Sequence, residues 1–153
     1  HRDAPHSCHG LLQPDAIRQH AIAVIQAFDV RSGEGPDSSA RAMSGGNQQK
    51  AIIGREFDQQ PDLLIAVQPT RGLDVGSIEY IHKRLIEQRD SGKAVLLVSL
   101  ELDEILDLSD RITVIHNGAL IGTVEARATD EKAIGLMMAG CRKDTMAGKE
   151  RAA

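Results

Sequence analysis

Apolar residues recur at helical spacing through much of the chain. Between residues 14 and 28 they return every three or four positions, and Pro14 suits a first helical turn because its missing N–H needs no partner there. The same pattern predicts helices over residues 48–57 and 74–90. The stretch 31–40 is rich in glycine, serine and proline, which predicts an exposed loop.

Two runs are continuously apolar instead of periodic. Residues 63–67 (Leu-Leu-Ile-Ala-Val) and 94–98 (Ala-Val-Leu-Leu-Val) each have the length of a strand, and the helix predicted over 74–90 lies between them. Continuous apolar runs are typical of strands buried on both faces inside a parallel sheet. A strand, a helix and a strand of these lengths predict a βαβ unit.

The following segment predicts a hairpin. A short acidic helix is expected over residues 101–108, and two strands over 111–116 and 119–124. Asn117-Gly118 lies between these strands, and an Asn-Gly pair between apolar runs is a strong signal for a tight turn.

A last helix is expected after Thr129, whose side chain can cap it, with Gly140 as its end. The segments outside residues 14–140 carry little pattern, so we expect flexible tails at 1–13 and 141–153 around one domain. The predicted fold class is α/β, with parallel strands, flanking helices, and a C-terminal β-hairpin and helix.

Composition excludes several functions. The 153 residues are 41% hydrophobic and 26% charged, as in ordinary globular domains. A net charge of -4 and 2% aromatic residues argue against nucleic acid as a partner. Cys8 and Cys141 lack the spacing of a zinc site or disulfide framework. His6, Cys8 and His9 could bind a metal, but a flexible tail explains them better.

Ser44-Gly45-Gly46 is the first candidate for chemistry. It directly precedes the helix predicted from residue 48, so backbone N–H groups and the positive end of the helix dipole would face an anion there. The glycines allow close approach to phosphate oxygens, and the serine hydroxyl adds a donor. Alone the tripeptide is a weak signal, because most such sequences are simple loops.

The order of the motifs makes that signal specific. The run 42–50 (Ala-Met-Ser-Gly-Gly-Asn-Gln-Gln-Lys) is followed by 63–74, by 95–101 and by 110–118, each on the expected element. This order resembles the signature half of an ABC-transporter ATPase, a P-loop NTPase, over residues 14–140. The resemblance implies a partial ABC ATPase fold.

Asn47 to Lys50, together with Arg71, look most like the second ATPase half of importers for sugars or nucleosides, in which two halves are fused. In that family ATP with Mg²⁺ is held between the phosphate loop of one half and the signature of the other. The resemblance implies that one set of residues contacts the nucleotide at the interface with a partner ATPase half: Ser44, Gly45, Gly46, Asn47, Gln48 and Asp74.

The sequence also departs from the family. It contains no G-x-x-x-x-G-K-S/T phosphate loop, so we do not expect the chain alone to bind nucleotide tightly. We expect that the upstream part of the domain has been cut away. An incomplete sheet would expose core residues and favour homo-oligomers of the chain.

Three further positions carry the wrong chemistry for catalysis. Where the family has a magnesium-binding aspartate and a glutamate base, this chain has Val67 and Gln68, and Leu100 replaces the histidine that contacts the γ-phosphate. Valine offers no oxygen to Mg²⁺, and a neutral amide cannot accept a proton at neutral pH. We therefore expect no catalytic residues and no metal ligands in this chain.

These features lead to one principal function and two alternatives. The resemblance implies an energy-coupling subunit at the cytoplasmic face of the cell membrane, with transmembrane permease subunits as further partners. The chain would be inactive by itself and would lend its signature to the partner's ATP site. The alternatives are a noncatalytic dimerisation or regulatory module, and a free-standing enzyme that uses Glu101 or Glu104 as its base.

Overall fold

The computed structural model describes residues 6–141. They form two compact units, the first made of residues 6–64 and 69–95 and the second of residues 65–68 and 96–141. None of the helices within residues 6–141 has the length and apolar character that a membrane-spanning segment needs.

The first unit begins with a small antiparallel hairpin that the sequence pattern did not predict. Ser7 pairs with Leu12 and Cys8 with Leu11. Residues 1–5 of the tail predicted at 1–13, and residues 142–153 of that predicted at 141–153, lie outside the described residues. The elements of this part of the unit are β1 (Ser7–Cys8), β2 (Leu11–Leu12), α1 (Pro14–Ala27), η1 (Gly35–Asp37), η2 (Ala40–Ala42) and α2 (Gly45–Asp58).

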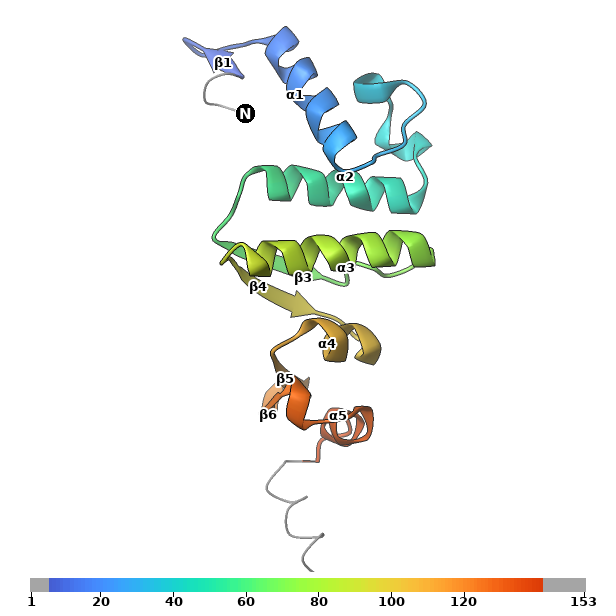
Figure 1. Cartoon of the computed structure of the whole chain (residues 1–153), viewed down its shortest axis with the longest axis vertical. Helices are drawn as coiled ribbons and strands as arrows, with labels where there is room; N and C mark the ends of the chain where they lie inside the picture. The colour runs from blue at the N-terminus through green and yellow to red at the C-terminus, as the bar shows by residue number, and fades with distance from the viewer. Residues whose placement is uncertain (1–5, 142–153) are drawn as a thin grey trace, which may run out of the picture. The chain divides into compact units, whose positions relative to one another are not determined.

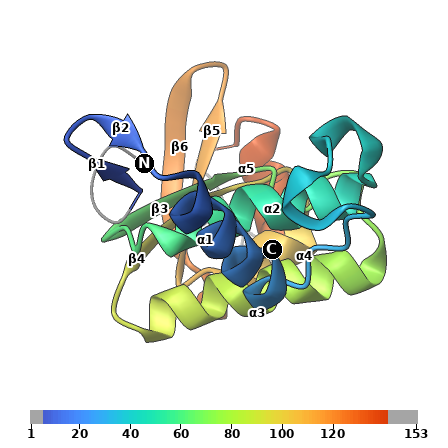
Figure 2. The ribbon, with the colours of Figure 1, turned by 90° about the horizontal axis from the view of Figure 1, so that it is seen from above.

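Helix α1 packs on α2 around two aromatic rings. Phe28 and Phe57 are both 6% exposed, and their ring centroids lie 6.0 Å apart at 79°, an edge-to-face arrangement. A Cβ atom on Gly54 would lie 3.0 Å from Phe28 Cγ and 3.0 Å from Val24 Cγ1, so the absence of a side chain there permits the close approach of the two helices. Figures 1 and 2 show α1 crossing α2.

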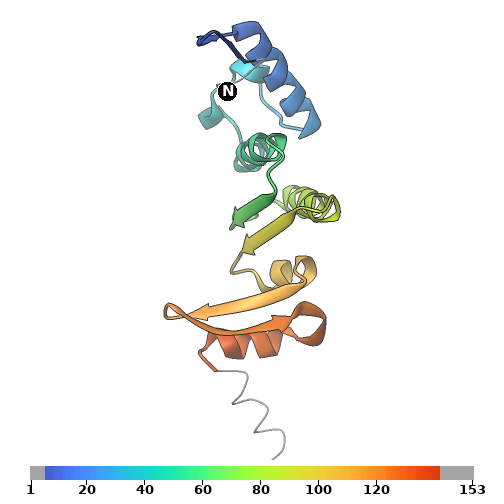
Figure 3. The same cartoon turned by 90° about the vertical axis from the view of Figure 1, so that its left-hand side faces the viewer.

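Helix α3 (Val75–Asp90) lies alongside α2 (Figures 1 and 3). Its Ile81 and Leu85 are buried and continue the apolar core. The guanidinium of Arg84 lies 4.3 Å from the centroid of the Phe28 ring, which joins the C-terminal end of α1 to α3.

Strands β3 (Leu63–Val67) and β4 (Ala94–Val98) form a two-stranded sheet. The Ala94 N–H donates to Asp62 O at 2.9 Å, and the Gln68 N–H donates to Val98 O at 2.8 Å. Both strands therefore run in the same direction, and with α3 between them they form the predicted βαβ unit.

The expectation that these strands are buried on both faces is wrong for this chain. Leu64 is 8% exposed, whereas Leu63, Ile65 and Val67 are 53%, 58% and 61% exposed. Successive side chains of a strand point to opposite faces of its sheet, so one face of β3 is packed and the other is open. The sequence pattern reports the apolar character of both faces but not which of them is covered.

The second unit contains the predicted hairpin. Its strands are β5 (Arg111–His116) and β6 (Ala119–Glu125), and both turn residues have positive φ, 48° for Asn117 and 75° for Gly118. These values fit the two central residues of a type I′ turn, which matches the twist of paired strands. The prediction of the turn is confirmed.

One apolar cluster joins the hairpin to the helices of this unit, α4 (Leu102–Leu108) and α5 (Glu131–Met138). A short turn, η3 (Ala126–Ala128), connects β6 to α5. The buried members of the cluster are Ile112, Val114, Val124, Ala126, Ile134 and Met137.

The structure corrects the predicted cap of α5. Asp130, not Thr129, is the N-cap, and its Oδ1 atom accepts a hydrogen bond from the Ala133 N–H at 2.8 Å. The predicted end at Gly140 is confirmed, because this residue has φ of 92° and its N–H donates to Met137 O at 2.9 Å.

Candidate nucleotide-contacting site

The signature glycines lie inside the first turn of α2, not before the helix as the sequence suggested. Ser44 has extended backbone angles, φ of -63° and ψ of 156°, and is the N-cap residue. The first helical bond runs from the Gln48 N–H to Ser44 O at 2.9 Å. The N–H groups of Gly45, Gly46 and Asn47 therefore precede the helical ladder, which is the arrangement that suits an anion.

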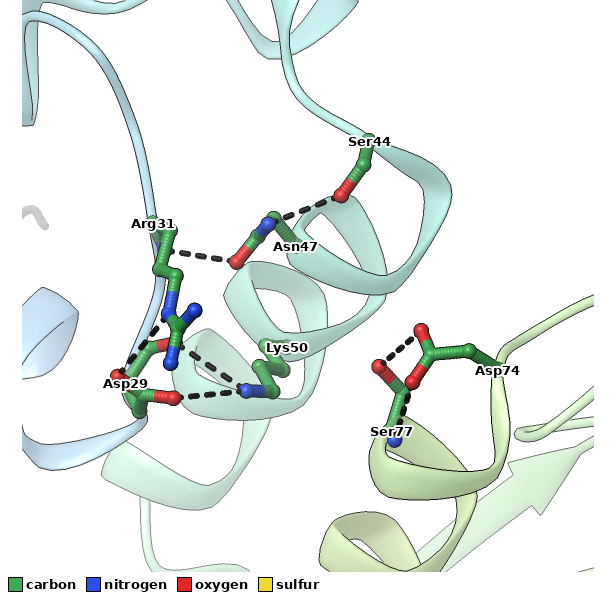
Figure 4. Close-up of polar contacts among 7 residues, drawn as sticks. All are labelled: Asp29, Arg31, Ser44, Asn47, Lys50, Asp74 and Ser77. Atoms are coloured by element: carbon green, nitrogen blue, oxygen red, sulfur yellow. Dashed lines mark hydrogen bonds and ion pairs between the residues drawn. The ribbon is translucent and has the colours of Figure 1, made fainter.

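The Ser44 hydroxyl is oriented by a side-chain amide (Figure 4). Asn47 Nδ2 donates to Ser44 Oγ at 2.9 Å, and Asn47 Oδ1 accepts from the Arg31 N–H at 2.7 Å. Ser44 does not cap the helix with its side chain. Since Oγ accepts from Asn47, the hydroxyl hydrogen can donate to an outside acceptor such as a phosphate oxygen.

The two glycines of the turn have different surroundings. A Cβ atom on Gly45 would meet nothing within 4 Å. A Cβ atom on Gly46 would lie 2.6 Å from Ser77 Oγ and 3.4 Å from Asp74 Oδ2. Gly45 therefore faces open space, where a ligand could approach, and Gly46 faces the start of α3.

Asp74 caps α3. Its Oδ1 accepts from the Ser77 N–H at 3.0 Å and its Oδ2 from the Ser77 hydroxyl at 2.8 Å (Figure 4). The Ser77 hydroxyl, and after it the Ser77 N–H, hold the pKa of Asp74 below its ordinary value. The carboxylate is thus engaged within its own chain, although it lies on the surface beside the signature turn.

A lysine anchors α2 to the turn after α1. Lys50 Nζ lies 3.0 Å from Asp29 Oδ2 and 3.3 Å from Asp29 O, and Asp29 has φ of 46° (Figure 4). The hydrogen bond from Lys50, then its charge, and then the charge of Arg31 lower the pKa of Asp29. Sequence reasoning missed this pair, because 21 residues separate its members.

The glutamines that follow the signature point to different segments. Gln48 Nε2 donates to Met43 O at 2.9 Å, which fixes the chain entering the helix. Gln49 Nε2 donates to Pro69 O at 2.9 Å, which reaches the loop before α3. The structure thus brings Ser44, Gly45, Gly46, Asn47 and Asp74 together, with Gln48 behind the turn.

The three positions expected to lack catalytic chemistry belong to the second unit. Val67 ends β3, and Gln68 follows it with φ of 49°. Leu100 is 69% exposed two residues beyond β4. Among the described residues, no cluster of three histidine, cysteine, aspartate or glutamate side chains could hold a metal ion. The side chains of Val67, Gln68 and Leu100 offer no carboxylate to a cation such as Mg²⁺.

No family model matches the chain, but curated ATP-binding proteins of importers are similar to it. The guanosine import ATP-binding protein of Bacillus subtilis is 59% identical over 138 residues, covering 89% of this chain and 26% of that protein. The nucleoside import ATP-binding protein of Lactococcus lactis is 58% identical over 136 residues, covering 89% and 27%. The glucose import ATP-binding protein of Haloferax volcanii is 48% identical, covering 81% and 23%.

Solved structures share the fold. A dimeric ATP-binding cassette in a post-hydrolysis state with ADP and Pi superposes with a TM-score of 0.65 at 22% identity, covering 80% of this chain and 52% of that one. A metal-chelate type ABC transporter in an inward-facing conformation gives 0.69 at 13% identity, covering 89% and 54%.

The chain therefore has part of the α/β fold of the ATP-binding cassettes of ABC transporters. Over most of its length the chain is homologous to the ATP-binding proteins of sugar and nucleoside importers. It spans about a quarter of the length of the curated relatives it matches.

Proposed function

We propose that this chain is the signature-bearing part of a cassette that has lost its own acid–base chemistry and completes the ATP site of a partner cassette. The observation that carries the proposal is a contrast between two sets of residues. Ser44 and Gly45 offer an oriented hydroxyl and an open glycine at a helix start, whereas Val67 and Gln68 offer no carboxylate.

The nucleotide would be contacted from one side only. The Ser44 hydroxyl and the N–H groups of Gly45 and Gly46 would donate to phosphate oxygens, and Asn47 would keep the serine oriented. Gln48 would support the turn through Met43. Bound ATP would supply the phosphoryl group that is cleaved, and its Mg²⁺ would be held by carboxylates of the partner half.

Asp74 would act through its loop and not as a base. Its carboxylate already accepts two hydrogen bonds from Ser77 and is held in the charged form. A cap of this kind gives residues 69–74 a fixed shape, with which the loop would meet the partner half. The cassette part of the chain would be residues 14–140, between tails at 1–13 and 141–153.

The cargo would be a nucleoside. The two relatives at 58% and 59% identity are named for nucleoside or guanosine import, while relatives at 38% to 48% are named for import of glucose, galactose, ribose or other carbohydrates. The importer would also contain transmembrane permease subunits, and this subunit would work at the cytoplasmic face of the membrane.

ATP turnover by the assembled transporter tests the proposal. Ser44→Arg puts a long side chain into the turn and should lower turnover about 100-fold, in the range found for losing a single oxyanion donor. Ser39→Arg, at the exposed N-cap of η2, is the matched control and should leave turnover unchanged. Gln68→Ala should also have no effect, because the site it belongs to is silent.

Two results would overturn the proposal. Unchanged turnover in Ser44→Arg would favour the alternative of a dimerisation or regulatory module that does not bind nucleotide. A large loss in Gln68→Ala would mean that the local site works with different chemistry. The enzyme alternative with Glu104 as base has a further difficulty, since that residue is 3% exposed.

A further inference from the structure

The first turns of α2 touch the loop 69–74 and its helix cap at two separate points. One contact is made by Gly46 and the other by Gln49, one helical turn later. Gln49 is absent from the set of residues expected to contact nucleotide. Both contacts lie within the first compact unit.

We propose that Gly46 and Gln49 are positioning residues that lock loop 69–74 of this chain to its signature turn, so that the turn and the loop move as one body. The inference rests on the proposed function for its consequence. If the turn contacts a phosphate and the loop meets the partner half, occupation of the turn would directly set the position of the loop.

The first contact depends on the missing side chain of Gly46. The nearest atom to an added Cβ would be Ser77 Oγ at 2.6 Å, closer than real Cβ contacts allow. Ser77 is 8% exposed, and its hydroxyl donates to Asp74 Oδ2 at 2.8 Å. Any side chain at position 46 would therefore displace this hydroxyl and break part of the cap on α3. The absence of a side chain at position 46 thus lets α2 pack closely on α3 of the same chain.

The second contact holds the other end of the loop. Gln49 Nε2 donates to the carbonyl of Pro69, the first residue of the loop, at 2.9 Å. Inside the loop the Leu73 N–H donates to Thr70 O at 3.2 Å, and Gly72 has φ of 73°. The loop is therefore closed on itself and fastened to α2 at its start, near Pro69, and at its end, near Asp74.

A double-mutant cycle on the 153-residue chain tests the first contact, with urea unfolding as the measurement. Gly46→Ala should raise the unfolding equilibrium constant about tenfold when Ser77 is present, and less than about threefold in a Ser77→Ala background, where the clashing oxygen is gone. Gly45→Ala is the control and should change the constant less than about twofold, because nothing lies within 4 Å of its Cβ position.

Equal effects of Gly46→Ala in both backgrounds would overturn this contact. So would an effect of Gly45→Ala as large as that of Gly46→Ala, because the cost would then come from the helix backbone and not from α3.

Amide hydrogen exchange without nucleotide tests the second contact. Gln49→Glu keeps the size of the side chain but removes its donor, so exchange at the Leu73 N–H should accelerate about fivefold or more, while the Ile81 N–H inside α3 stays unchanged. Gln59→Glu makes the same chemical change at the exposed end of α2 and should leave Leu73 unaffected. Equal acceleration at Leu73 and Ile81, or none at Leu73, would refute the anchor.

Failure of this inference is distinguishable from failure of the proposed function. If the effects of Gly46→Ala and Ser77→Ala on stability are additive while Ser44→Arg still lowers ATP turnover, the contact between turn and loop is refuted and the proposed function stands. If the two effects are coupled while Ser44→Arg leaves turnover unchanged, the contact is a packing feature only and the turn has no nucleotide role.

Discussion

Lys50 Nζ lies 3.0 Å from Asp29 Oδ2 and so joins the middle of the signature helix to the turn that follows α1. The lysine side chain is only 12% exposed, and its ammonium also lies 4.7 Å from the centroid of the Tyr80 ring on α3. The Lys50 ammonium on α2 thus contacts both the turn after α1 and helix α3.

Replacing that cation should weaken the first unit. Lys50→Met keeps the apolar stem but loses the cation–π contact with Tyr80, worth about 0.5–1 kcal/mol, together with the pair to Asp29. Urea unfolding should report the loss, and added salt should narrow the gap to the unmodified protein, because salt screens the pair with the exposed Asp29. Lys83→Met, at an exposed position of α3, is the control. A difference that does not respond to salt would show that the ion pair contributes nothing.

The cap of α3 should make stability depend on acid. Because the folded pKa of Asp74 lies below its ordinary value of 3.8, the carboxylate stabilises the fold at pH above 3.8, and that contribution is lost as the pH falls through the lower, folded pKa. Asp74→Asn can still cap but cannot titrate. The difference in Tm between the unmodified protein and Asp74→Asn should therefore shrink as the pH is lowered from about 6 to about 2.5. A constant difference over that range would contradict the assignment.

Two glycines in helix interiors should respond oppositely to alanine. Gly54→Ala forces a methyl group against Phe28 and Val24 at 3.0 Å and should cost about 1–3 kcal/mol. Gly135→Ala in α5 meets nothing within 4 Å and should stabilise the protein by about 0.5–1 kcal/mol through helix propensity. Urea unfolding measures both changes. A neutral Gly54→Ala would mean that α1 moves away from α2 without cost.

The corrected cap of α5 can be tested directly. Asp130→Ala removes the acceptor of the Ala133 N–H and should destabilise the second unit by about 1 kcal/mol. Thr129→Ala should have little effect, because its side chain is not the cap. Circular dichroism during thermal unfolding gives the Tm of each variant. A larger loss of Tm in Thr129→Ala than in Asp130→Ala would restore the cap to Thr129.

Periodicity and turn chemistry predicted most of the elements. The helix over residues 74–90, the strand over 94–98 and the hairpin at Asn117-Gly118 all lie where the sequence placed them. Their signals are local, because a helix face, an apolar run and a turn dipeptide each depend on neighbours within a few residues.

Boundaries and caps were predicted less well. The sequence placed the start of the signature helix at residue 48, but the structure places it at Gly45, since Ser44 has the extended backbone angles of an N-cap. Glycine disfavours a helix interior, so propensity alone hid the fact that two glycines form the first turn.

Residue identity by itself determined which functional groups these positions offer. Val67 and Gln68 lack a carboxylate in any fold, and Ser44-Gly45-Gly46 is a turn that can donate hydrogen bonds wherever it begins a helix. Only the tertiary structure decided which glycine faces open space and which faces α3, and that Gln49 reaches Pro69 while Gln48 reaches Met43. The contact of Gln48 with Met43 spans five residues. The contacts of Gln49 with Pro69 and of Gly46 with Ser77 join segments about 20 to 30 residues apart, and such contacts are fixed by how helices pack and not by local sequence pattern.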